Sequence, residues 1–245
     1  MDNNTVINYS LSIIHYQLST IHYCMKIVAQ TISVIAHPLL MLTYMLLLLL
    51  LVNPYLFGVN SIGDLESRKL ILSVFFTSFL LPAVAIFIMR KLDLVKSLEM
   101  RDKQDRIGPF IVTGIFYLWV FQNVLRNDDM PTAFLIAVLG TTMGLFLCFL
   151  INLFFKISIH ATGIGGYIGM ILITMWLYSY GAFEMWLPFV GACTVSINLV
   201  LMLSLFIAGL IGTARLGLGA HTSRELYAGF ALGLICQYVA LKILL

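Results

Sequence analysis

Uncharged apolar stretches recur along the whole chain, and they constrain its fold more than any other feature. A hydrocarbon core about 30 Å thick is crossed by roughly 20 apolar residues in a helix. Hydrophobic residues make up 61% of the 245, more than a water-soluble fold of this size can bury. The sequence therefore predicts an all-α, multi-pass membrane helical bundle, and argues against a soluble enzyme, a disordered chain or a nucleic-acid-binding protein. The expected spans are residues 33–57, 70–89, 109–125, 130–155, 162–181, 185–212 and 226–245.

The number of spans is six or seven on this pattern, because the third stretch is short and the last contains Gln237 and Lys242. Residues 1–32 lie outside the predicted transmembrane domain, 33–245. Their apolar positions alternate spacings of four and three, which predicts an amphipathic helix either in the membrane interface or packed on a partner helix. The sequence does not decide between these, and it leaves the oligomeric state open.

Charged side chains cluster in the connections, and 10 of the chain's 25 fall within residues 90–106. Two spans separate this loop from the 156–160 segment, and two more separate that from residues 213–225. An even number of crossings returns a chain to the same side, so we expect all three segments at one membrane face. The loop alone is also compatible with a solvated tether.

Arginine, lysine, serine and histidine side chains in these segments suit a phosphate group. Guanidinium forks bind phosphate oxygens, and imidazoles attack phosphorus or move protons. Each residue also has a simpler interpretation, because Lys156 and Arg215 are compatible with snorkelling and a histidine at a membrane edge with an interfacial anchor.

The 221–225 segment predicts a helix start near Thr222, since its first residues fit a capping box. His221 would then precede a helix N-terminus, where backbone amides and the helix dipole favour an anion. Glu225, one turn further on, is placed to accept the Nδ1 proton of His221 and leave Nε2 free as a nucleophile.

The spacing Arg215-x5-His221-x3-Glu225 resembles the third signature of the type 2 phosphatidic acid phosphatases, Ser-Arg-x5-His-x3-Asp. These are integral-membrane lipid phosphatases related to the vanadium haloperoxidases. The 157–160 segment is similar to their second signature, Pro-Ser-Gly-His, in its serine and histidine. Arg106 is the best match to the first signature, Lys-x6-Arg-Pro. The resemblance covers about residues 100–240, and the chain departs from it at several positions: Glu225 for aspartate, Ala214 for serine, Ile157 and Ile159 for proline and glycine, and Glu99 for lysine.

The resemblance implies a metal-independent reaction without a cofactor. In it, His221 attacks phosphorus to form a phosphohistidine, Glu225 orients it, and His160 protonates the departing lipid oxygen. The candidate phosphate-binding residues are Arg215, Ser158, Arg106, Lys156, and Lys103 or Arg101 in place of the missing lysine.

The implied substrate is a phosphomonoester or pyrophosphate of a membrane lipid, whose identity the sequence leaves open. Basic residues are usually enriched in the cytoplasmic connections of a membrane protein. Ten basic residues lie on the side of the membrane where the three charged segments are expected, and four lie on the opposite side. Six of those ten belong to or adjoin the candidate site, and without them the count is four on each side, which indicates no orientation. Orientation therefore rests on the resemblance, which implies a cell-membrane protein with an extracytoplasmic site. The departures motivate an alternative, a non-catalytic phospholipid-binding or transport protein. A transporter of another solute is a weaker alternative, indicated by His37-Pro38 and two further prolines that are expected to kink helices.

Overall fold

The computed structural model describes residue 16 and residues 23–96, 104–187 and 191–245. Most of the expected amino-terminal amphipathic helix lies outside these residues, as do Arg101 and Lys103. Most of the described residues are helical, and the sheet among them has only two strands, so the all-α prediction is confirmed. The described residues contain seven helical segments that are long and apolar enough to cross a membrane, which identifies the chain as a multi-pass membrane protein.

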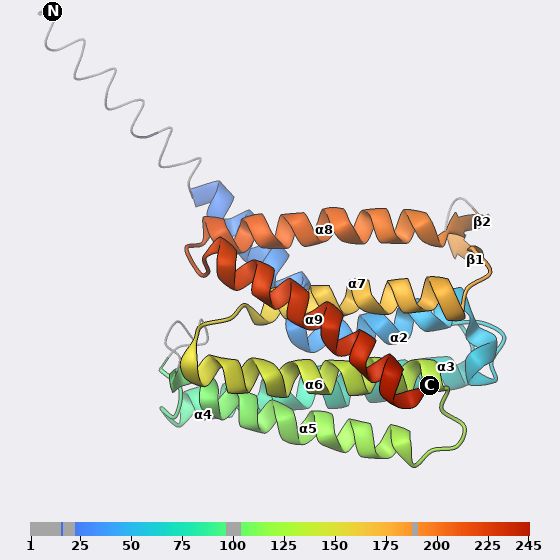
Figure 1. Ribbon diagram of the computed structural model, residues 1–245, viewed down its shortest axis with the longest axis horizontal. Coiled ribbons are helices and arrows are strands. Elements are labelled where there is room, and N and C mark those ends of the chain that lie inside the picture. The colour runs from blue at the N-terminus through green and yellow to red at the C-terminus, as the bar shows by residue number, and fades with distance from the viewer. Residues whose placement is uncertain (1–15, 17–22, 97–103, 188–190) are drawn as a thin grey trace, which may run out of the picture.

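The helices run back and forth between two ends of an elongated bundle (Figure 1). The α-helices labelled in Figure 1 are α2 (Met41–Val52), α3 (Leu65–Phe75), α4 (Leu81–Lys91), α5 (Ile107–Leu125), α6 (Thr132–Phe154), α7 (Ile159–Leu177), α8 (Ile197–Gly217) and α9 (Ser223–Leu244). Three short 3-10 helices are η1 (Pro38–Leu40), η2 (Pro54–Phe57) and η4 (Gln104–Arg106), and the π-helix η3 (Phe76–Leu80) joins α3 to α4.

The first span, Tyr23–Val52, is interrupted near its middle. Helix covers residues 23–35, so it continues through the expected boundary at residue 32. Pro38 has no backbone N–H to continue the helical hydrogen bonds, and His37 instead caps η1. The interruption brings the side chain of His37 into the interior of the bundle.

The expected span at 185–212 is wrong in its first part. The strands β1 (Ala182–Leu187) and β2 (Gly191–Ser196) pair antiparallel as a hairpin, and α8 begins only at Ile197. Gly181 and Gly191 have φ of 90° and 87°, a conformation that other residues rarely adopt and that helices do not contain. Hydropathy alone does not distinguish an apolar hairpin from a helix, so the error followed from the apolar character of this segment.

Helices α7 and α9 pack closely through glycines. A Cβ on Gly229 would lie 2.7 Å from the carbonyl oxygen of Ser158, and one on Gly233 would collide with that of Thr162. The glycine run at 163–166 therefore serves helix packing, as is usual in membranes. This contact brings the start of α9 against the start of α7, where the 156–160 and 213–225 segments meet.

Candidate functional site

Three charged segments meet at one end of the bundle. The α4–α5, α6–α7 and α8–α9 connections lie there, whereas the hairpin and the α2–α3 and α5–α6 connections lie at the opposite end (Figure 1). Helices α5, α7 and α9 all begin at this end, so three helix N-termini direct the positive ends of their dipoles towards it. This arrangement favours a bound anion before any side chain is considered.

A cavity of about 470 Å³ extends from this end into the bundle. Its volume is in the range that small-molecule sites occupy. Four of the candidate residues and one further histidine contribute to its lining: Arg106, His160, Arg215, His221 and His37.

His221 and Glu225 form a hydrogen-bonded pair in the connection that leads into α9. Thr222 caps this helix, and its hydroxyl accepts a hydrogen bond from the Glu225 backbone N–H at 3.4 Å. The carboxylate of Glu225 is 2.7 Å from Nδ1 of His221, four residues earlier in the chain. Because a carboxylate accepts, Nδ1 carries the hydrogen of the neutral ring, and Nε2 has a free lone pair.

Burial is the main cause of a lowered pKa at His221, whose side chain is 2% exposed. The positive charges of Arg215, Arg106 and Lys156 lower this pKa further, whereas the hydrogen bond with Glu225 raises it. The ring is therefore neutral near pH 7. A neutral imidazole with a free Nε2 is the form that acts as a nucleophile.

Arg106 ties the first charged segment to the second. It is only 5% exposed, it ends η4 directly before α5, and its Nη1 donates to the carbonyl oxygen of Ile157 at 3.3 Å. A buried guanidinium at the cavity wall suits an anionic ligand.

Ser158 is placed differently from the prediction. It is fully buried, its hydroxyl caps α7 by accepting from the Ala161 N–H at 3.4 Å, and it does not belong to the described lining of the cavity. Its backbone N–H donates to the carbonyl oxygen of Glu225. Ser158 therefore caps α7 and connects its start to the start of α9.

His160 lies in the first turn of α7, and this helix begins three residues before the expected start of the span. Its Nε2 is 3.2 Å from the carbonyl oxygen of Ser33. A carbonyl only accepts, so Nε2 carries a hydrogen, and Nδ1 is the other ring nitrogen. His160 is also within electrostatic range of Arg215 and His221.

The remaining cations differ in position. Arg215 lies in the last turn of α8, lines the cavity and interacts electrostatically with all three histidines of the lining. Lys156 interacts electrostatically with His221 and Glu225 but lies outside the described lining. Arg101 and Lys103 are outside the described residues, so their predicted roles stay predictions.

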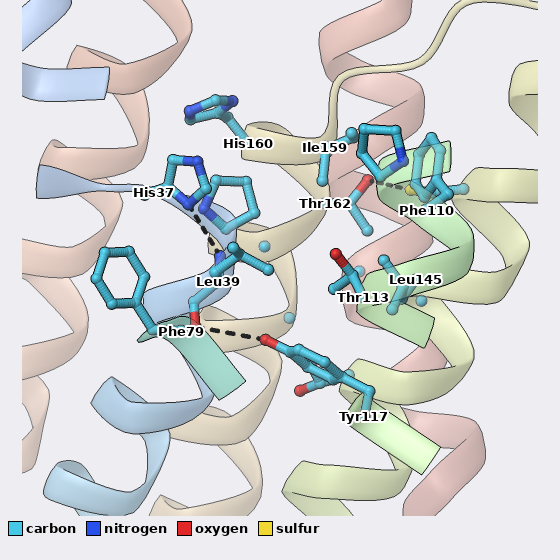
Figure 2. Close-up of a pocket in the computed structure, with 18 of the residues that line it drawn as sticks. His37, Leu39, Phe79, Phe110, Thr113, Tyr117, Leu145, Ile159, His160 and Thr162 are labelled. Atoms are coloured by element: carbon cyan, nitrogen blue, oxygen red, sulfur yellow. Dashed lines mark hydrogen bonds between the residues drawn. The ribbon is translucent and has the colours of Figure 1, made fainter. Parts of the chain in front are cut away.

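His37 is the residue of the lining that sequence reasoning missed. Its ring faces that of His160, with centroids 5.8 Å apart and planes at 78° (Figure 2). The sequence indicated only a helix kink at His37-Pro38. A histidine inside an otherwise apolar span is itself a signal of function, since polar side chains are costly there.

The rest of the lining is apolar and continues deeper into the bundle. Phe79 and Leu39 lie beyond His37 as seen from His160, and Tyr117 lies further still (Figure 2). Val34 and Phe87, which also line the cavity, are 68% and 51% exposed on the outer surface of the bundle. The cavity thus has a charged end and an apolar limb, and some of its lining residues are also exposed on the outside of the bundle.

Comparisons with known proteins add no family to this picture: no family model, curated protein or solved structure matches the chain. Within the described part of the chain, no group of three His, Cys, Asp or Glu side chains is arranged to hold a metal ion. The fold and the site define a multi-pass membrane protein with an internal cavity that is cationic at one end and apolar along its length.

Proposed function

We propose that this protein is a membrane-embedded phosphatase that hydrolyses a phosphomonoester or pyrophosphate of a membrane lipid through a phosphohistidine, without a metal ion. The single observation that carries the proposal is the His221–Glu225 pair: Glu225 engages Nδ1 of His221, and His221 lines the same cavity as Arg215, Arg106 and His160. Phosphoryl transfer requires mainly alignment and neutralisation of charge on three oxygens, and fixed cations and helix N-termini supply both.

The reaction proceeds in two steps. Nε2 of His221 forms a bond to phosphorus as the bond to the lipid oxygen breaks, and that electron pair stays on the lipid oxygen. His160 takes a proton from the bound phosphate monoanion on the ring nitrogen that does not contact Ser33, and it delivers this proton to the lipid oxygen. Water then attacks the phosphohistidine and gives a proton to His160, which passes it to the departing phosphate, so both rings are restored.

The apolar limb supports a lipid rather than a soluble phosphate. A chain that lies along Phe79 and Tyr117 keeps its headgroup among the cations, and the exposed lining residues Val34 and Phe87 provide access from the bilayer. We also propose that the site faces the extracytoplasmic side of the cell membrane, as the motif resemblance implies.

The purified protein is expected to release phosphate from at least one lipid phosphate or pyrophosphate in EDTA. His221→Ala is the control, because it removes the nucleophile. A broad panel of lipid phosphates that yields no more phosphate with the wild type than with His221→Ala would contradict the proposal.

A second candidate function is lipid-phosphate binding or transport without turnover. The position of Ser158 favours it, because the hydroxyl expected at the phosphate caps α7 instead. Binding of a lipid phosphate by the wild type, without release of phosphate and without a labelled phosphohistidine, would support this second function.

A further inference from the structure

His37 stands at the boundary between the charged end of the cavity and its apolar limb. Its ring contacts His160 on one side and Phe79 on the other, with centroids 5.8 Å and 6.1 Å away, both nearly edge to face. The charge of Arg215 acts on it as well. His37 belongs to the first span, so none of the motif segments contributes it.

The local backbone holds this ring in one orientation and one protonation form. Nδ1 of His37 accepts the Leu39 N–H at 3.3 Å, and the residue's own carbonyl oxygen accepts from Leu40 at 2.9 Å. A ring nitrogen that accepts a backbone N–H carries no hydrogen, so neutral His37 carries its hydrogen on Nε2. Within the described residues, the structure gives Nε2 of His37 no hydrogen-bond acceptor.

The two histidines at this boundary are thus prepared for different tasks. Nε2 of His160 is bonded to Ser33, which leaves Nδ1 of that ring to exchange a proton. His37 cannot become doubly protonated without losing its bond from Leu39, so it remains a neutral hydrogen-bond donor. Such a donor acts by fixed polarity and transfers no proton.

We propose that His37 is a further catalytic residue, which donates a hydrogen bond from Nε2 to the lipid oxygen that leaves phosphorus. This inference rests on the proposed phosphatase function. A substrate with its phosphorus near His221 and its chain in the apolar limb must pass the ring of His37 at the junction, where the bond from phosphorus to the lipid oxygen lies. The hydrogen bond strengthens as negative charge develops on that oxygen, while His160 supplies the proton.

Two substitutions of His37 distinguish the role of Nε2 as a hydrogen-bond donor from the role of Nδ1 as the cap of η1. His37→Asn keeps an acceptor near Nδ1 and a favourable capping residue but has no donor at the position of Nε2. His37→Gln loses the cap but reaches that position with its amide N–H. The probes are a long-chain alkyl phosphate and a nitrophenyl phosphate with the same alkyl chain, whose leaving group needs little stabilisation.

With the alkyl phosphate, His37→Asn is expected to lower kcat/KM about 10- to 100-fold, and His37→Gln is expected to recover most of the activity. With the nitrophenyl phosphate, the loss in His37→Asn is expected to be below about threefold. Unchanged activity in His37→Asn, or an equal loss on both probes, would overturn the role of His37. If the wild type is no more active than His221→Ala, the phosphatase proposal fails instead, so the two failures are distinguishable.

Discussion

Glu225 contributes to the proposed chemistry only through its contact with His221. The carboxylate lies outside the described lining of the cavity, 2.7 Å from Nδ1, and its side chain is 20% exposed. The spacing of four residues and the helix start at Thr222 were predicted from the sequence, because capping residues and helical periodicity are local signals.

Glu225→Gln is expected to reduce kcat about 10- to 100-fold with little change in KM, because an amide orients the imidazole less well than a carboxylate. The measurement is phosphate release from a lipid phosphate over a range of concentrations. Glu66→Gln is the matched control, since Glu66 is exposed and pairs with Lys69 instead. If both variants retain the activity of the wild type, Glu225 has no orienting role.

The lowered pKa of His221 predicts how stability depends on pH. In the unfolded chain a histidine has a pKa of about 6.5. At pH values between the lowered pKa of His221 in the folded protein and this unfolded pKa, the unfolded chain binds a proton that the folded protein does not. The free energy of unfolding therefore falls as the pH falls through this window.

Thermal unfolding in detergent at about pH 7.5 and about pH 5 measures this effect. The wild type is expected to lose more stability between the two than His221→Asn, which has no group that titrates at this position. A smaller loss in the wild type would mean that the folded protein raises the pKa of His221 instead.

At the level of elements, the pairing of α7 with α9 fixes the site, because it places the starts of both helices side by side. Gly165, Gly229 and Gly233 allow this approach, since a Cβ at each would meet backbone of the other helix. A glycine-rich pattern is typical of close helix packing in membranes, but it does not indicate which helices pack. The hairpin at 182–196 was not predicted, because its apolar residues satisfy a helix as well as a strand.

Gly165→Ala is expected to destabilise the protein by about 1–3 kcal/mol, because its Cβ would collide with the backbone of Phe230. The same loss of stability is not expected for Gly209→Ala in α8, where nothing lies within 4 Å of the new Cβ. Midpoints of thermal unfolding in one detergent compare the two. Equal midpoints would contradict the tight packing of α7 on α9.

For the whole molecule, the sequence predicted which segments share one end, because alternation of spans and loops determines it. The sequence did not predict that Ser158 is outside the described lining of the cavity or that His37 lines it, since both depend on how helices distant in the chain pack. Motif spacing gives no information about a residue contributed by the first span.

Single cysteines in a cysteine-free background test the arrangement of the two ends. Ser223 and Asp93 are exposed at the site end, and Asn60 and Asn127 are exposed in connections at the opposite end. In intact cells, a membrane-impermeant maleimide is expected to label Ser223→Cys and Asp93→Cys, and to label Asn60→Cys and Asn127→Cys only after lysis. Labelling of Ser223→Cys and Asn60→Cys from the same side would exclude this topology, and the reverse pattern would place the site in the cytoplasm.

We propose that His221, His160 and Arg215 enclose a phosphate group at the charged end of one cavity. An experimental structure of the protein with vanadate tests this arrangement, because vanadate adopts the geometry of phosphorus during transfer. We expect vanadium bonded to Nε2 of His221, with oxygens facing Arg215 and His160. Vanadate bound elsewhere, or a cavity that excludes it at concentrations that inhibit phosphate release, would show that these residues do not form the phosphate site.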